Sequence, residues 1–167
     1  MLQGTAGYSY GANGLWQINR PEKPYGPSPH GMAWGDNPWT EALHFPGSAQ
    51  IALGKKLFER YPWWQFRPHP EWVTPHAGGE DYFQPFAAGI PGQVRMVYFP
   101  WPLAPWVQPS PQILELEPGL TYKAFFFNPL TGQEYPAGQA QADEQGKWVI
   151  PMPPIGVDIV LVLEREP

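Results

Sequence analysis

The stretch Val157-Asp158-Ile159-Val160-Leu161-Val162-Leu163, near the end of the printed sequence, carries the clearest fold signal. Its last five residues are aliphatic and three of them are β-branched, so the stretch favours a β-strand. A strand with one face in water alternates apolar and polar side chains, and this one does not. It therefore predicts a central strand that is covered on both faces.

More strands are expected upstream, at residues 93–99, 113–117, 121–127 and 147–150. Within 113–117, Leu114 and Leu116 are expected to point inward and the two glutamates outward, because side chains alternate along a strand. Asn128-Pro129 and Gly132 predict a tight turn after the third of these segments. Short strands separated by turn signals predict an antiparallel β-sandwich or jelly roll in this half of the chain.

The first half has a different pattern, in which residues 4–10 predict a strand and residues 11–30 a long loop. Asp36 then predicts the N-cap of a short helical turn over 39–45, and Pro46 restarts a helix that Pro62 stops. The apolar residues of this helix, Ile51, Leu53, Leu57 and Phe58, need a partner surface that one short strand does not provide. A strand, a loop and a helix make half of a β/α unit, and the rest of that layer is expected upstream of Met1.

A domain boundary is expected at residues 74–79, where proline and paired glycines interrupt the chain. The two sides differ in charge, since residues 1–78 hold six Lys+Arg and five Asp+Glu, and residues 79–167 hold four and ten. The sequence therefore predicts two units, residues 1–78 and residues 79–167.

Composition excludes several classes of protein. The 167 residues include 24 Pro and 18 Gly, a level that approaches disorder, but nine Trp, nine Phe and eight Tyr predict a packed core. A net charge of −5 with 10 Lys+Arg disfavours a nucleic-acid partner, and the longest apolar run, 159–163, is too short to span a membrane. The absence of cysteine excludes disulfides, thiolate metal sites and thiol catalysis, and leaves the compartment undecided.

The segment Tyr8 to Gln17 is the strongest candidate for a binding site. Tyr10 and Trp16 supply aromatic faces and Asn13 supplies an amide, which together suit the C–H face and the hydroxyls of a sugar. Such a loop after a barrel strand lies where (β/α)₈ enzymes place their sites. The alternative, equally weighted, is an aromatic loop that packs under its own prolines.

Catalytic and metal sites have weaker support. Glycoside cleavage needs two carboxylates about 5–5.5 Å apart, or further apart for inversion. Asp36 is explained as a cap, Glu59 lies on the helix and Glu22 belongs to a solvated charge cluster, so no catalytic residue is assigned. The histidines show no pairing at i,i+4, and neither a metal site nor a cofactor is predicted.

Three segments carry a resemblance to a known family: residues 6–17, residues 37–50 and Pro62-Trp63-Trp64. They resemble the C-terminal end of the apiosidase-like glycoside hydrolase domain. Residues 127–134 and 157–164 resemble the small β domain that follows it there, which is labelled collagen-binding.

The resemblance implies an α+β chain, with the last strand and helix of a TIM-like (β/α)₈ barrel followed by a complete β-sandwich. It also implies a carbohydrate substrate, the side chains of plant polysaccharides. The catalytic carboxylates are then expected on earlier barrel strands, so the chain is expected to be inactive alone. Tyr10, Asn13, Trp16 and Trp34 are the site-rim residues that it supports. For the parent enzyme, an extracellular or periplasmic location is expected; the oligomeric state stays open.

Two other functions stay open at this point. The second half could be a carbohydrate- or matrix-binding module without catalysis, or a structural buttress without a ligand. A binding module predicts that Trp101, Trp106 and Trp148 form an exposed planar row, whereas a buttress predicts that they are buried against the first half.

Overall fold

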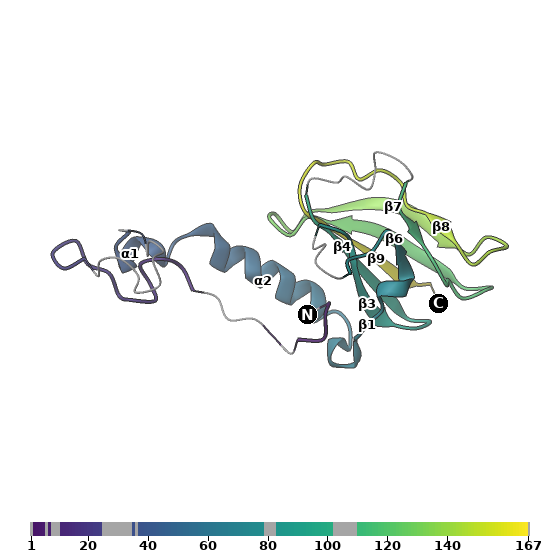
Figure 1. Cartoon of the computed structure of the whole chain (residues 1–167), viewed down its shortest axis with the longest axis horizontal. Helices are drawn as coiled ribbons and strands as arrows, with labels where there is room; N and C mark the ends of the chain where they lie inside the picture. Colours follow the sequence, from purple (N-terminus) through teal and green to yellow (C-terminus); the bar gives the residue numbers. More distant parts are fainter. Residues whose placement is uncertain are drawn as a thin grey trace.

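The computed structural model describes residues 2–5, 7, 11–24, 35, 37–78, 83–101 and 110–166. The molecule consists of a body of β-strands and a helical arm that extends away from it, with α1 at the far end of the arm (Figure 1). Among the described residues, no helix is long and apolar enough to cross a membrane. The mixed composition of the fold, with mostly antiparallel β structure, agrees with the α+β class predicted from the sequence.

Two antiparallel sheets form the β body. The larger has the strand order β1-β3-β4-β9-β6-β7, made by Arg67–Pro68, Phe86–Ile90, Val94–Phe99, Ile159–Arg165, Thr121–Phe127 and Glu134–Gln141. The smaller has the order β2-β5-β8, made by Val73–Thr74, Gln112–Ile113 and Trp148–Val149. Because β1 and β2 pair with β3 and β5, the β structure begins upstream of the boundary predicted at residue 79.

Strand β9 lies in the middle of the larger sheet, between β4 and β6, as the apolar run predicts. Its Ile159, Leu161 and Leu163 are buried on one face, and Val162 is buried on the other. The prediction of a central strand that is covered on both faces is therefore confirmed.

The two faces of the larger sheet belong to two hydrophobic cores. The first core joins both sheets, because Val73 and Ile113 of the smaller sheet pack with Val97, Tyr122 and Phe126 of the larger one. The second core lies on the opposite face and includes Met96, Phe125 and Val162 together with Leu57 and Phe66, which lie at and just beyond the end of the arm. The arm is thus attached to the β body through its C-terminal end.

The arm contains α1, Trp39–Ala42, and α2, Pro46–Phe58, with Pro46 in the first turn as predicted. Two 3₁₀ turns, η1 at Trp63–Gln65 and η2 at Pro70–Trp72, connect the arm to the sheets. Of the apolar residues of α2 only Leu57 is buried, and Ile51 is 37% exposed. Asp36, the predicted cap, lies outside the described residues.

The structure corrects the prediction for segment 113–117. The strand ends at Ile113, and Glu115 adopts a positive φ of 53°, which breaks the alternation of side chains. Ile113 and Leu116 are the buried residues, and Leu114 is only partly buried. The apolar and acidic alternation in the sequence therefore does not mark a strand here.

The strand predicted at residues 4–10 is not seen where the structure describes that segment. Residues 2–5 form a turn and a bend, Gly7 is irregular, and residues 8–10 lie outside the described part of the chain. Conversely, β3 and β7 were not predicted, because Gly89, Pro136 and Gly138 are unfavourable in strands. In β3 the glycine has a steric role, since a Cβ on Gly89 would lie 2.1 Å from the carbonyl oxygen of Val94.

Candidate functional site

The described part of the predicted long loop, residues 11–24, contains residues 11–17 of the candidate site segment and is fastened to the start of α1. Asn19 is 2% exposed. Its backbone N–H donates to the backbone oxygen of Gly14 at 2.8 Å, and its backbone oxygen accepts from the backbone N–H of Trp39 at 2.9 Å. Its amide nitrogen donates to the oxygen of Asn37 at 3.3 Å. These bonds hold the loop in one position relative to the helix.

Gly14 allows the loop to approach α1 this closely. Its φ is +95°, and a Cβ there would lie 2.2 Å from the backbone oxygen of Asn37 and 3.4 Å from the Cβ of Ala42. A side chain at this position would push the loop away from the helix. Neither Asn19 nor Gly14 was singled out from the sequence, although a glycine between predicted site residues was a signal for a close approach.

Trp16 and Asn13, the two predicted rim residues in the described part of the chain, are both exposed to solvent. Trp16 is 75% exposed, and its ring lies 3.6 Å from the position of a Cβ on Gly11. The alternative in which the loop packs its aromatic residues under its own prolines therefore does not describe Trp16. Tyr10 and Trp34 lie outside the described residues.

A hollow of about 670 Å³ lies beside this loop and is lined by Arg20, Pro21, Glu22, Lys23, Pro38, Trp39 and Thr40. It combines an indole ring and two prolines with two cations, one carboxylate and a hydroxyl. The sequence interpretation of residues 20–23 as a solvated charge cluster did not anticipate this hollow, because Trp39 and Thr40 come from α1.

Two described carboxylates of this part of the chain, Glu59 and Glu71, are held in pairs. Glu59 is exposed and pairs with Lys55 at 3.4 Å along the helix, and Glu71 bonds to Nδ1 of His69 at 2.7 Å. Burial would raise the pKa of Glu71, but the hydrogen bond with His69 and the nearby charges lower it below the ordinary value. A general acid needs a raised pKa, so Glu71 is unsuited to that role.

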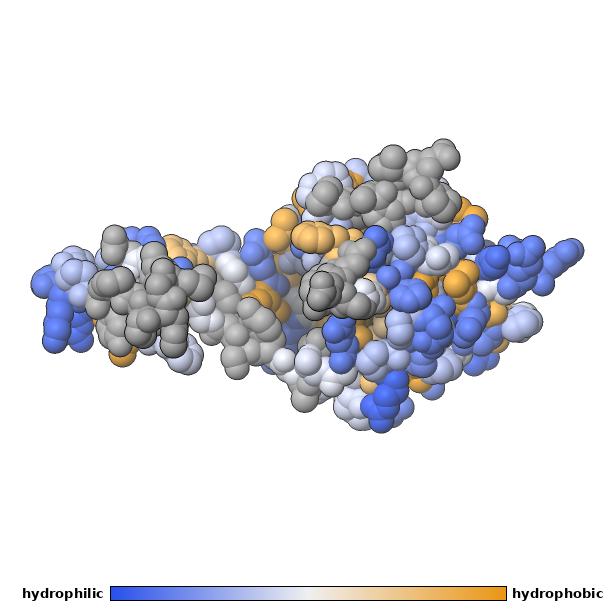
Figure 2. All heavy atoms as spheres, in the orientation of Figure 1, coloured by the Kyte–Doolittle hydropathy of each residue, from blue (hydrophilic) through white to orange (hydrophobic). Residues whose placement is uncertain are grey.

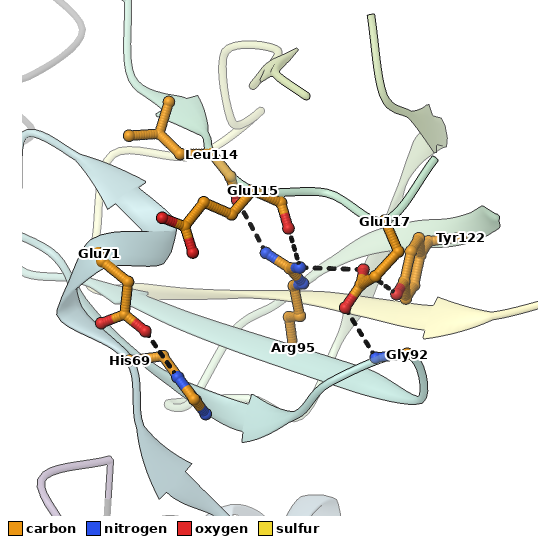
Figure 3. A network of polar contacts seen from close by, with 8 residues as sticks. All are labelled: His69, Glu71, Gly92, Arg95, Leu114, Glu115, Glu117 and Tyr122. Carbon is orange, nitrogen blue, oxygen red and sulfur yellow. Dashed lines mark hydrogen bonds and ion pairs between the residues drawn. The ribbon is translucent and has the colours of Figure 1, made fainter. Parts of the chain in front are cut away.

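A second polar cluster, inside the β body, is structural (Figure 3). Arg95 is 1% exposed, donates to the backbone oxygens of Leu114 at 2.8 Å and of Glu115, and pairs with Glu117 at 2.9 Å. Its guanidinium carbon also lies 4.0 Å from the centre of a ring of Trp72. Arg95 thus holds the turn after β5 against the sheet.

Glu117 is fixed by three donors in this cluster. In addition to Arg95, it accepts from the hydroxyl of Tyr122 at 2.5 Å and from the backbone N–H of Gly92 at 2.8 Å. Burial would raise the pKa of Glu117, but the Tyr122 hydrogen bond and Arg95 hold it below the ordinary value. Burial and the same hydrogen bond raise the pKa of Tyr122. The carboxylate is held ionised, which suits a structural ion pair.

The first part of the chain is similar to a known family of proteins. Residues 1–65, which include the candidate loop, α1 and α2, match the family model described as Apiosidase-like, catalytic domain. The match ends just before β1, so it covers the arm and not the β body.

Two solved structures have a similar fold. One is titled "Glycoside hydrolase" and has a TM-score of 0.71 and 21% identity over 96% of this chain and 33% of the other. The second is a glycoside hydrolase family 5 from Bacteroides vulgatus, with a TM-score of 0.70 and 22% identity over the same shares. The chain is thus similar to glycoside hydrolases, in sequence over residues 1–65 and in fold over most of its length. No curated protein matches it, and it spans about a third of the length of these two structures.

Proposed function

We propose that this chain is the C-terminal part of a glycoside hydrolase similar to apiosidases, with a carbohydrate-binding rim on the loop of residues 11–24. In this proposal the arm is the last unit of a (β/α)₈ barrel, and the β body is a sandwich-type domain that follows it. The catalytic carboxylates belong to barrel units that this chain lacks, so the chain alone does not hydrolyse glycosides.

The family match over residues 1–65 carries the proposal, because it coincides with the segment in which the candidate loop is fastened to α1. The two sheets that share the first core support the sandwich-type domain. The exposure of Trp16 supports the rim, since a ring that is 75% exposed contributes little to a core and can face a ligand.

The substrate in this proposal is an apiose-containing side chain of a plant polysaccharide. Trp16 presents its ring face to the sugar and Asn13 hydrogen-bonds its hydroxyls. Tyr10 and Trp34, which lie outside the described residues, are further candidates for the same role. The hollow lined by residues 20–23 and by Trp39 belongs to the same loop and the start of α1, and in this proposal it offers the ligand a further aromatic wall.

The inactivity of the isolated chain is tested with a chromogenic apioside. We expect no release of the chromophore, because a mechanism with two carboxylates needs both groups at one site. Turnover by the purified chain that is lost in a Glu22→Gln variant would contradict the proposal.

The rim is tested in an enzyme that carries this chain after the remaining barrel units. Trp16→Ala is expected to lower kcat/KM by at least about tenfold, the loss of about 1.4 kcal/mol of binding to the transition state, at an unchanged melting temperature. Trp64→Ala is the matched control, since Trp64 is also an exposed tryptophan of the arm. A large fall in the melting temperature of Trp16→Ala would mean that the ring is structural.

A further inference from the structure

The first residue of interest beyond the loop of residues 11–24 is Trp101, which follows the end of β4 on the β body. It is 50% exposed, although a large aromatic side chain is normally among the best fillers of a core. Scattered surface hydrophobic residues are ordinary, so exposure alone indicates no function. The contacts that hold Trp101 in place distinguish it from such residues.

Gly156 forms a seat for one face of the Trp101 ring. A Cβ on Gly156 would lie 2.9 Å from Cη2, 3.3 Å from Cζ3 and 3.4 Å from Cζ2. Cζ3 and Cζ2 are too close for a Cβ in the plane of the ring, so this position lies off that plane, over the outer end of the six-membered ring. The backbone of Gly156 is not in the left-handed region, so a side chain there would meet the ring itself, which would have to move.

Asp158 fixes the backbone of Trp101 through a hydrogen bond. Its Oδ1 accepts the backbone N–H of Trp101 at 2.6 Å, and its Oδ2 accepts the hydroxyl of Tyr98 at 2.7 Å. Tyr98 in turn stacks on Phe86, with ring centres 6.4 Å apart. Each carboxylate oxygen has two acceptor positions, so Asp158 keeps capacity for further donors.

From this arrangement we propose that Trp101 and Asp158 form a subsite for one neutral sugar ring on the β body. The free face of the indole covers the C–H face of the sugar, and a sugar hydroxyl donates to Asp158. Because the ring is already seated on Gly156, ligand binding does not have to immobilise it, which lowers the entropic cost. The carboxylate and the net charge of −5 disfavour a sugar that carries its own carboxylate.

This subsite is smaller than the planar row that a binding module predicts. Trp148 is only partly exposed and packs against the first core, so it does not extend the surface of Trp101, and Trp106 lies outside the described residues. A single stacked sugar without a second platform predicts weak binding. The subsite does not depend on the proposed glycoside hydrolase function, since none of its residues lies in the arm.

The test uses the full chain with ¹⁵N-labelled tryptophan, so that each indole N–H gives one NMR signal. The Trp101 signal is assigned as the one missing from the Trp101→Phe spectrum. The chain is titrated separately with xylohexaose, cellohexaose and hexagalacturonate. We expect the Trp101 signal to shift with a neutral oligosaccharide and to stay in place with hexagalacturonate.

The variants separate this subsite from other tryptophans. Trp101→Ala is expected to weaken binding by about tenfold or more, and Gly156→Ala is expected to weaken it by displacing the ring. Trp101→Phe keeps a smaller ring and should retain part of the affinity, which covers the case in which the alanine variant does not fold. Trp64→Ala, which removes another exposed tryptophan in η1, should bind as the unchanged chain does.

Three results would overturn the proposal: no shift of the Trp101 signal with either neutral oligosaccharide, undiminished binding by folded Trp101→Ala, or equal binding of hexagalacturonate. Loss of binding in Trp16→Ala but not in Trp101→Ala would assign the sugar to the loop of the proposed function instead. Failure of the Trp101 subsite is thereby distinguished from failure of the proposed function.

Discussion

Replacement of Arg95 by methionine is expected to destabilise the β body by about 3–5 kcal/mol, the usual cost of removing one partner from a buried ion pair. Methionine keeps most of the length and the apolar volume of the side chain but donates no hydrogen bond. The variant leaves the backbone oxygens of Leu114 and Glu115 without their donor and Glu117 without its cation. It also loses the contact of the guanidinium with Trp72, at 4.0 Å from the ring centre.

The loss is measured by urea unfolding of the full chain, with the free energy extrapolated to water. A domain of ordinary stability has about 5–15 kcal/mol, so a loss of this size consumes a large share of it. The free energy of unfolding of Arg95→Lys should lie between those of the unchanged chain and of Arg95→Met. An ammonium group keeps the charge but not the planar guanidinium that reaches both backbone oxygens. Arg165→Met, an exposed arginine of β9, is the matched control and should change stability by less than about 0.5 kcal/mol. A loss below about 1 kcal/mol in Arg95→Met would refute the structural role given to this cluster.

Three further predictions concern the same body and the arm. The pKa of Glu117 in the folded chain lies below its ordinary value of 4.5. Its contribution to stability is therefore present above pH 4.5 and is lost as the pH falls through the lowered pKa. Glu117→Gln should lose less stability than the unchanged chain between neutral pH and pH about 3, as measured by urea unfolding. Gly54→Ala should raise stability by about 0.5–1 kcal/mol, because Gly54 lies inside a helix and a Cβ there meets nothing within 4 Å. Gly132→Ala should lower stability, because Gly132 has a φ of +76° and a Cβ there would lie 3.0 Å from Leu53. Melting temperatures of the two variants that moved in the same direction would contradict this. A fragment that begins at residue 66 should unfold cooperatively. A fragment that begins at residue 80 should be much less stable, because it lacks Trp72 and Val73 of the first core. Equal melting temperatures of the two fragments would show that the β structure before residue 79 is dispensable.

The parts of the fold that the sequence predicts are those with a strong local signal. The unbroken apolar run predicts β9 and its burial on both faces, and Pro46 predicts the start of α2. The turn after β6 follows from Asn128 and Gly132, since Asn128 Oδ1 accepts from the N–H of Leu130 and Gly132 has a positive φ. In each case the local preference and the tertiary environment agree.

The parts that the sequence does not predict depend on contacts between distant residues. Glycine is needed at position 89 of β3 because Val94 of the adjacent strand and Trp72, which lies well before it in the sequence, approach its backbone closely. The burial of Arg95 does not follow from the alternation of β4, because its acceptors belong to a turn with an unusual φ at Glu115. The hollow beside residues 20–23 needs side chains from α1, which lie far along the sequence.

The arm shows why the proposed function calls for further barrel units. Helix α2 has 13 residues, a length at which an isolated helix is marginal in water, so packing must supply most of its stability. In the described part of the chain that packing comes from its last turns, through Leu57 in the second core and through Gly132 against Leu53. The links that follow, Tyr61 to Glu164 and Arg60 to Glu134 at 2.6 Å, again hold only the C-terminal end. Ile51 is exposed and a Cβ on Gly54 would meet nothing within 4 Å, so units packed against these positions would stabilise the helix and the loop fastened to it.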